Sequence, residues 1–207
     1  MRNEVLYLLL NQYADHEPAF LASAIACDER NIKEHPKYIN KIVAPTLEPV
    51  CSCCGFRTIP DYSFETMPDD YAALVLIGGF GWLDKETASK VAPIVRQTVE
   101  KGIIVGAICN AASFLAQHGF LNAVRHTGNG LEQLQSWGGD NYTNAAGYVN
   151  KQAVSDKGIV TANGTGYLEF AKELLLLLKN DTPEQIECFY RFNKIGYVEI
   201  LRQNGKR

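Results

Sequence analysis

The sequence predicts an α/β protein in which a mostly parallel sheet is covered by helices on both faces. Its short candidate strands, such as Leu74–Ile77 and Ile103–Ile108, are apolar throughout. Strands buried on both faces read as such runs, whereas half-exposed strands alternate apolar and polar residues. Segments with helical spacing alternate with these strands, which is the order of a parallel sheet with helical crossovers. No repeat or low-complexity linker interrupts the chain, so we expect one domain over residues 1–207.

The expected elements follow from local signals taken in chain order. Pro18 stands where a first-turn proline is tolerated, and Pro45 and Pro49 break any long element. Asp156-Lys157-Gly158 is a turn sequence between two short apolar runs. The resulting order is a strand at Glu4–Leu10, a loop at Asn11–Glu17, a helix from about Pro18 to Glu34, strands at Tyr38–Ala44, Gly55–Ile59 and Leu74–Ile77, a helix at Lys85–Lys101, a strand at Ile103–Ile108, a helix from Cys109 to near Gly119, a short segment at Glu132–Trp137, a hairpin of Ala153–Ser155 with Ile159–Ala162, a helix at Tyr167–Leu178 and a last helix from Pro183 toward Phe192. We expect a core over about 4–178 and a C-terminal helical extension over about 180–207.

Composition and charge exclude several classes of function. The chain has 207 residues, of which 46% are hydrophobic and 21% charged, and its net charge is −3. A chain of this kind buries a core unaided, and without a basic excess it is not expected to bind nucleic acid. The apolar block Val5–Leu10 is too short for a signal sequence or a membrane span. We therefore expect a cytoplasmic protein with no membrane partner.

Six cysteines raise the question of disulfides or metal. Because the chain is long and shows no secretory signal, reduced thiols are the better expectation. Cys51, Cys53 and Cys54 have a C-x-C-C spacing that does not match a zinc ribbon, and no second Cys/His pair follows. A cluster of thiols in a loop or at a strand edge is the plainer interpretation, and we expect no metal and no cofactor.

One cysteine has the setting of a nucleophile. The strand before Cys109 passes directly into a helical pattern, and the residues around this corner are small: Gly106, Ala107, Ala111 and Ala112. Such a corner, a nucleophile elbow, needs small neighbours because the backbone is crowded there. It lifts one side chain over the first amides of the following helix, where the thiolate is favoured. The alternative is a small buried cysteine at the end of a core strand.

Further candidates lie where other strands end, because ligands bind beyond the carboxyl ends of parallel strands. Glu17, in the loop after the first strand, is placed to hydrogen bond the thiol or orient a base, although a first-turn acid such as Asp15 fits the same position. His126 follows the elbow helix and is the best-placed base, unless it is only a surface-loop histidine; His16, His35 and His118 are weaker. The amides of Gly78, Gly79 and Asn110 are candidate oxyanion donors, although glycines after a strand also serve merely to form turns.

These residues together resemble the ThiJ/PfpI superfamily, which has the class I glutamine amidotransferase-like fold. The likeness rests on Leu74–Gly79, on the Gly-Ala-Ile-Cys elbow at Gly106–Cys109, on His126 and on the run Gly158–Gly166 that leads into Leu168–Ala171. It implies a flavodoxin-like three-layer sandwich, usually a dimer or larger, with Cys109 as nucleophile and Glu17 as the carboxyl that hydrogen bonds it. Members are described as proteases or amidases, glyoxalases or deglycases, chaperones and oxidation sensors.

The sequence departs from the protease-type members of that family at the elbow. They carry His directly after the cysteine, whereas this chain has Asn110, followed by Ala111 in place of a common Gly. An amide does not take up a proton at neutral pH, so the adjacent Cys–His mechanism is unavailable unless His126 substitutes.

Three functional hypotheses follow. The first is a cysteine-dependent hydrolase or lyase for a small carbonyl or amide compound; the second is an oxidation sensor or stress-response protein that uses the same cysteine. The third is a binding fold that has kept the elbow without its chemistry. Glutamine amidotransfer is the least expected, because it needs a late histidine and there is none after Ala162.

Overall fold

A seven-stranded sheet forms the centre of the molecule in the computed structural model, which describes residues 3–27, 32–203 and 205. Neighbouring strands are parallel except for β8, which pairs antiparallel with β9 as a hairpin. The strands are, in spatial order, β5 (Tyr62–Ser63), β2 (Ile39–Ala44), β1 (Glu4–Leu8), β6 (Ala73–Leu76), β7 (Ile104–Ile108), β9 (Ile159–Ala162) and β8 (Ala153–Asp156). The predicted α/β class and the predicted hairpin are both confirmed.

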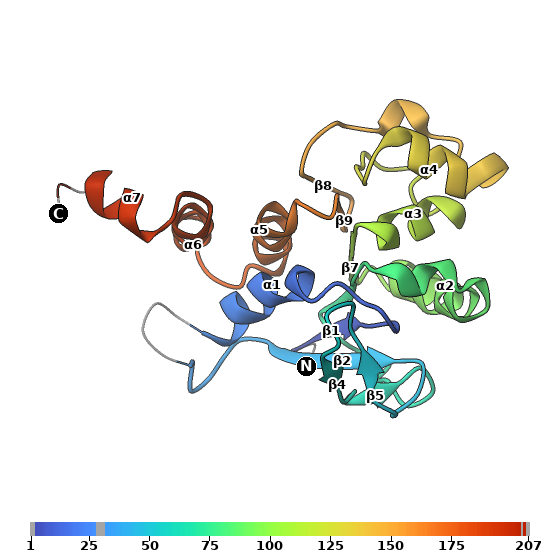
Figure 1. Cartoon of the computed structure of the whole chain (residues 1–207), viewed down its shortest axis with the longest axis horizontal. Coiled ribbons are helices and arrows are strands. Elements are labelled where there is room, and N and C mark those ends of the chain that lie inside the picture. The colour runs from blue at the N-terminus through green and yellow to red at the C-terminus, as the bar shows by residue number, and fades with distance from the viewer. Residues whose placement is uncertain (1–2, 28–31, 204, 206–207) are drawn as a thin grey trace.

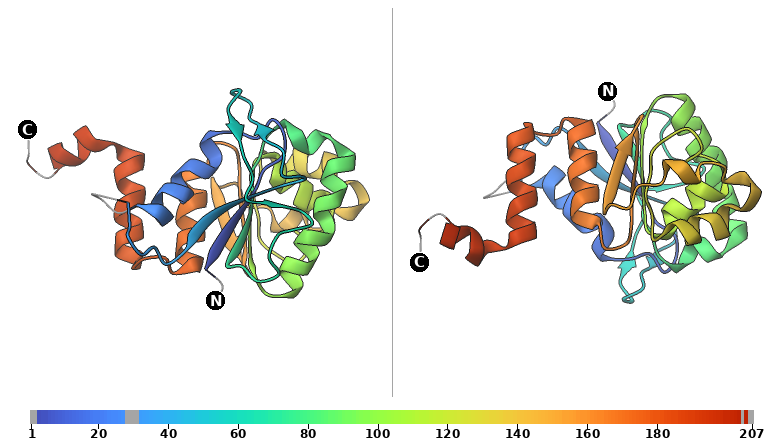
Figure 2. Two further views of the ribbon diagram at one scale, coloured as in Figure 1. Left: turned by 90° about the horizontal axis from the view of Figure 1, so that it is seen from below. Right: turned by 90° about the horizontal axis from the view of Figure 1, so that it is seen from above.

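Helices cover both faces of this sheet, so that it forms the middle of three layers (Figures 1 and 2). One face carries α1 (His16–Ala26) and α5 (Tyr167–Leu178); the other carries α2 (Lys85–Glu100) and α3 (Asn110–Gln117), with α4 (Leu131–Gly138) packed on α3. Short 3-10 turns occur at η1 (Phe80–Leu83), η2 (Gly139–Asn141) and η3 (Ala145–Gly147). Within the described residues, no helix is both long and apolar enough to cross a bilayer.

The central strands β6 and β7 are apolar throughout, and β1 is apolar after Glu4, because each of their faces meets a different hydrophobic core. Along β1, Leu6 and Leu8 belong to the core under α2 and α3, whereas Val5 and Tyr7 belong to the core under α1 and α5. Successive side chains of a strand point to opposite faces, so a strand between two cores has no solvent-facing position.

Two of the expected elements differ clearly in the structure; in addition, Glu17 lies in the first turn of α1 and not in a loop, and β5 and a separate helix at Tyr197–Gln203 are not among the expected elements. Helix α1 begins at His16 and ends at Ala26, and Cys27 is already extended and forms a bridge with Ile32. A helix to Glu34 is therefore wrong at residues 32–34, and positions 28–31 lie outside the described residues. The short strand expected at Gly55–Ile59 is β4 (Arg57–Thr58), which pairs with β3 (Val50–Cys51) in a separate two-stranded sheet.

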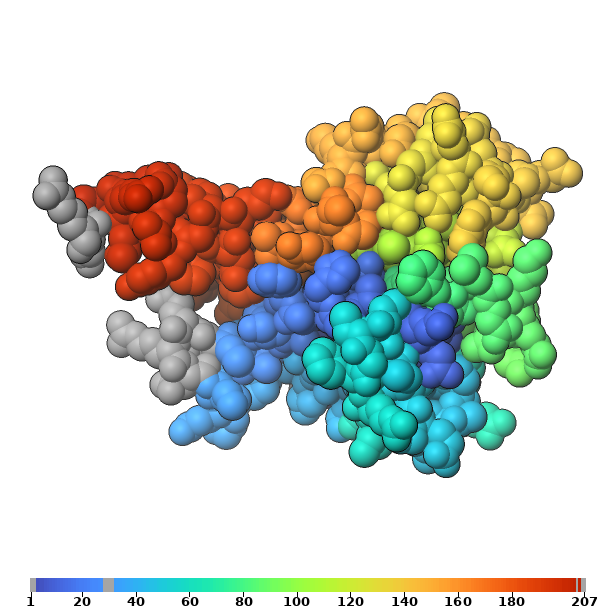
Figure 3. All heavy atoms as spheres, in the orientation of Figure 1, coloured from blue at the N-terminus to red at the C-terminus, as the bar shows by residue number. Residues whose placement is uncertain are grey.

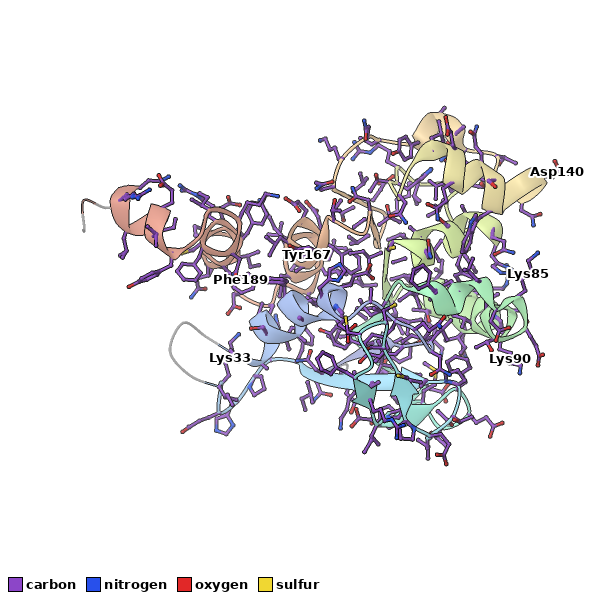
Figure 4. The ribbon with its side chains drawn as sticks, viewed as in Figure 1. Lys33, Lys85, Lys90, Asp140, Tyr167 and Phe189 are labelled. Carbon is purple, nitrogen blue, oxygen red and sulfur yellow. The ribbon has the colours of Figure 1, made fainter. Side chains whose placement is uncertain are left out.

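The C-terminal segment forms two helices outside the central layers. Helix α6 (Pro183–Ile195) starts with a capping box, in which Thr182 and Gln185 satisfy each other's amides. It packs on α5 through Phe189, and α7 (Tyr197–Gln203) contacts α6 (Figure 4). Figure 3 shows these helices as an arm that projects from the body of the molecule.

Candidate active site

Cys109 occupies the predicted corner between β7 and α3. Its backbone has φ 60° and ψ −127°, a conformation that is strained for any residue except glycine. The Cys109 amide donates to Ala162 O at 2.9 Å, which ties the corner to the end of β9. A β-carbon on Gly78 would lie 2.6 Å from the Glu17 carboxylate, so only glycine fits where the neighbouring strand passes the elbow. The elbow is thus held by contacts on both sides.

Glu17 is the carboxyl that the structure brings to Cys109. Its side chain is 1% exposed, and its Oε2 accepts a hydrogen bond of 2.6 Å from the Gly78 amide. It also hydrogen bonds the Cys109 thiol. Burial raises the pKa of Glu17 to about 7, because removal from water disfavours the charged form more than these hydrogen bonds favour it. The carboxyl therefore exchanges its proton near neutral pH.

The Cys109 sulfur is half-buried between amide donors and this carboxyl. Burial raises the pKa of the thiol, and the negative charge of Glu17 raises it further. Asn129 Nδ2, at 3.3 Å, and the Asn110 amide donate to the sulfur and act in the opposite direction. The expectation that the elbow favours thiolate is therefore wrong for the site with Glu17 ionised, because burial and the carboxylate outweigh the amides.

Asn129 is a site residue that the sequence did not reveal. Its Oδ1 accepts from the Gly164 amide at 2.9 Å, so the loop after α3 is joined to the end of β9 beside the sulfur. The Asn110 side chain donates to Gly79 O at 2.9 Å and accepts from Gln133 Nε2 at 2.8 Å. The position after the cysteine is thus filled by a fixed amide. Two glycines flank Asn129 in Gly128-Asn129-Gly130, which was the available signal for a closely packed loop.

His126 is buried and does not reach the sulfur. Its Nδ1 pairs with Val124 O at 2.9 Å and its Nε2 with Tyr142 Oη at 2.6 Å. Burial lowers its pKa, so the neutral imidazole is favoured. The expectation that His126 manages protons for Cys109 is corrected: both ring nitrogens are occupied in another part of the fold. The exposed His16, at the start of α1, lies nearer, with Nε2 3.2 Å from Gly164 O.

The three predicted oxyanion donors are not equivalent. The Gly78 amide is already bonded to Glu17, so it is corrected from an oxyanion donor to the group that holds the carboxyl. The Asn110 amide donates to the sulfur itself. The amides of Gly79 and Asn110 remain the predicted donors to a reacting oxygen.

A second cysteine–carboxyl pair joins the start of α1, at Asp15, to the turn that follows β3, at Cys54. Cys51, Cys53 and Cys54 are all exposed there, and every cysteine of the chain is a free thiol. Cys54 hydrogen bonds Asp15, and its pKa is raised by that bond and by the carboxylate charge. Among the described residues, no three His, Cys, Asp or Glu side chains are placed to hold a metal ion.

A model of the DJ-1/PfpI family matches residues 3–177, which include every strand of the central sheet and Cys109. The chain belongs to this family. The resemblance inferred from the elbow, the glycine pair and the Gly158–Gly166 run is thereby confirmed.

Individual members of the DJ-1/PfpI family are similar over nearly the whole chain. A Bacillus subtilis relative described as the uncharacterized protease YdeA is 36% identical, covering 98% of this chain and 96% of its own. The crystal structure of a thiJ/pfpI family protein from Bacillus anthracis matches with a TM-score of 0.85 at 30% identity, over 93% of this chain and 90% of that one. The DJ-1 superfamily protein Atu0886 from Agrobacterium tumefaciens gives 0.80 at 33% identity, over 92% and 97%. The flavodoxin-like sandwich is therefore shared with these family members.

Proposed function

We propose that this protein is a cysteine-dependent enzyme for small carbonyl compounds, with Cys109 as nucleophile and Glu17 as the group that moves its proton. The observation that carries the proposal is the buried hydrogen bond between the Cys109 thiol and Glu17, whose pKa is raised to about 7. General acid–base catalysis is most efficient when the pKa of the catalytic group lies near the working pH. Glu17 meets this condition, whereas an exposed glutamate does not.

The proposed step is the addition of the thiol across a carbonyl group. The sulfur forms a bond to the carbonyl carbon while the thiol proton passes to Glu17, and the C=O π pair moves to the oxygen. Glu17 then returns the proton to that oxygen, giving a hemithioacetal. The amides of Gly79 and Asn110 are proposed to hold the oxygen while it is negative.

Carbonyl addition suits the site better than hydrolysis of a peptide bond. Hydrolysis needs a proton donor for the leaving amine and then a base for water, a role that histidine commonly fills. Asn110 stands after the cysteine, and both ring nitrogens of His126 are bonded elsewhere. The Bacillus subtilis relative is named a protease, so amide hydrolysis is the variant of this function to assay beside carbonyl turnover.

The experiment compares two cysteine variants. Methylglyoxal consumption and small-amide hydrolysis are measured for the wild type, for Cys109→Ser and for Cys54→Ser, which alters an exposed cysteine of the second pair. We expect Cys109→Ser to lose at least about 1000-fold in kcat/KM for the carbonyl compound, and Cys54→Ser to keep wild-type activity. Retained turnover in Cys109→Ser would remove this cysteine from the mechanism.

Oxidation sensing is the second candidate, favoured by the donors around the sulfur. Asn129 Nδ2 and the Asn110 amide already donate to it, and either could donate to the oxygens of an oxidised cysteine. In this case mild peroxide adds two oxygens selectively at Cys109, seen by peptide mass spectrometry, and no carbonyl or amide compound is turned over.

A further inference from the structure

A hollow near the Cys109 thiol is lined only by glycines and uncharged polar residues. It measures about 470 Å³, within the range of small-molecule sites, and three glycines and six polar residues line it: Asn129, Tyr148, Asn150, Gln152, Asn163 and Thr165. None of its lining residues carries a charge. Asn129 lies within hydrogen-bond reach of the Cys109 sulfur, and a β-carbon on Gly164, which also lines the hollow, would lie 3.1 Å from it. The hollow therefore adjoins the elbow through Asn129 and Gly164, although Cys109 itself is not one of its lining residues.

One wall of this hollow is fixed by its own hydrogen bonds. Gln152 Oε1 accepts from Asn163 Nδ2 at 2.7 Å, and Gln152 Nε2 donates to Thr165 Oγ1 at 3.2 Å. Asn163 Oδ1 in turn accepts from the Thr165 hydroxyl at 2.7 Å. A wall that is ordered before binding loses little conformational entropy when a ligand arrives. The three side chains thus form a preorganised polar surface.

Two further lining residues offer hydrogen-bonding groups that have no protein partner among the described residues. Within the described part of the chain, neither the Asn150 side-chain amide nor the Tyr148 hydroxyl hydrogen bonds another protein group. Each of them both donates and accepts, which matches a hydroxyl group, also a donor and an acceptor. Carboxylate and phosphate are held best by Arg or Lys, and neither residue lines the hollow.

We propose that this hollow binds the hydroxyl groups of a neutral substrate, so that the carbonyl compounds proposed above are short hydroxyaldehydes or open-chain sugars. The inference rests on the proposed function for its chemistry and on the hollow for its choice of substrate. The carbonyl carbon lies at Cys109, and the hydroxylated chain extends past Asn129 toward Asn150 and Gln152. Compounds of the same length that carry a carboxylate or phosphate bind more weakly.

The first experiment measures turnover with the full-length protein. We expect kcat/KM for D-glyceraldehyde and D-erythrose to exceed that for glyoxylate and glyceraldehyde 3-phosphate by more than about tenfold, the effect of losing a matched pair of polar contacts. Asn150→Ala should raise KM for D-erythrose about fivefold and leave KM for methylglyoxal, which has no hydroxyl group, unchanged. Lys151→Ala is the matched control, since its side chain is exposed beside the hollow without lining it.

The second experiment does not depend on catalysis. Erythritol and D-erythronate are the same length and differ only in their ends, and binding is followed by the NMR shifts of the Asn150 and Gln152 side-chain amides. Tighter binding of erythritol, weakened by Asn150→Ala and not by Lys151→Ala, supports the proposal. Equal or tighter binding of erythronate, or an equal KM effect of Asn150→Ala on methylglyoxal, would overturn it. If the protein binds erythritol but shows no Cys109-dependent turnover of any carbonyl compound, only the proposed function is refuted.

Discussion

Two cysteine–carboxyl pairs take their carboxyls from the start of α1, and burial makes them behave differently. Glu17 with Cys109 is buried, and its carboxyl has a pKa raised to about 7. In the other pair Cys54 is exposed and Asp15 is only partly buried: burial raises the pKa of Asp15, but hydrogen bonds from Ser52 and Cys54 outweigh it and lower the pKa overall. The same two functional groups thus form a proton-exchanging pair in one place and a fixed carboxylate in the other. Desolvation, and not proximity, separates the candidate active site from a loop contact.

The sharpest test of this difference replaces each carboxyl by its amide. Glu17→Gln keeps an acceptor for the Gly78 amide and a donor for the sulfur, so the fold and the contacts are retained. Because the amide cannot carry the thiol proton to the substrate, we expect kcat/KM for methylglyoxal to fall about 1000-fold. Asp15→Asn should change it less than about threefold, as measured by the same initial rates. Comparable losses in both variants would erase the distinction between the pairs.

The pH dependence of stability separates the pairs by sign. The native pKa of Glu17 lies above its ordinary value of 4.5, so the folded protein binds more protons than the unfolded chain between pH 4.5 and about 7. This contribution is fully present below pH 4.5 and is lost as the pH rises through 7. Over that window we expect the free energy of unfolding of the wild type to fall by about 3 kcal/mol relative to that of Glu17→Gln, because the comparison cancels the contributions of His118 and His126, whose pKa values are lowered. Asp15, whose pKa is lowered, contributes with the opposite sign at acid pH. Urea unfolding at pH 5, 6, 7 and 8 measures the slopes.

A variant of His126 tests whether this histidine takes part in proton transfer beside Cys109 and Glu17. His126→Asn removes the bonds to Tyr142 and Val124, so we expect a loss of about 2 kcal/mol in stability from two broken buried hydrogen bonds. Once corrected for the folded fraction, kcat should change less than about threefold. Tyr142→Phe removes the same hydrogen bond from the other side and should act in the same direction. A loss of kcat specific to His126→Asn would restore the histidine to the mechanism.

The smallest expected effect concerns the space over the buried sulfur. A β-carbon at Gly164 would lie 3.1 Å from Cys109 Sγ and 3.6 Å from Glu17 Oε1. Gly164→Ala should therefore crowd the thiol and lower kcat/KM up to about tenfold, with an overpacking cost near 1 kcal/mol. Cys54 is far less sheltered than Cys109, so the rate at which it reacts with a thiol reagent is the internal control. Unchanged rates at Cys109 would mean that substrate reaches the sulfur from another side.

The elbow and Glu17 could be predicted because their signals are local. Small residues must flank Cys109 because a strand turns sharply into a helix there, and Glu17 lies in the first turn of the helix that follows the first strand, at the edge where a parallel sheet collects its strand ends.

The remaining site residues depend on partners that are distant in the sequence. His126 is held away from the sulfur by its hydrogen bond to Tyr142. Asn129 is positioned by the Gly164 amide, 35 residues away in the sequence. The Gly78 amide could serve an oxyanion or a carboxyl, and only the buried approach of Glu17 decides between them. The end of α1 at Ala26 likewise reflects the pairing of Cys27 with Ile32. Tertiary contacts of this kind leave no periodic pattern in a single sequence.

The most direct test of the buried pair is the pH dependence of Cys109 alkylation, followed by peptide mass spectrometry in the wild type and in Glu17→Gln. Since the charge and hydrogen bond of Glu17 both raise the pKa of the thiol, its removal should lower the midpoint and speed alkylation at pH 8, while carbonyl turnover is lost. An unchanged or higher midpoint in Glu17→Gln would contradict the account.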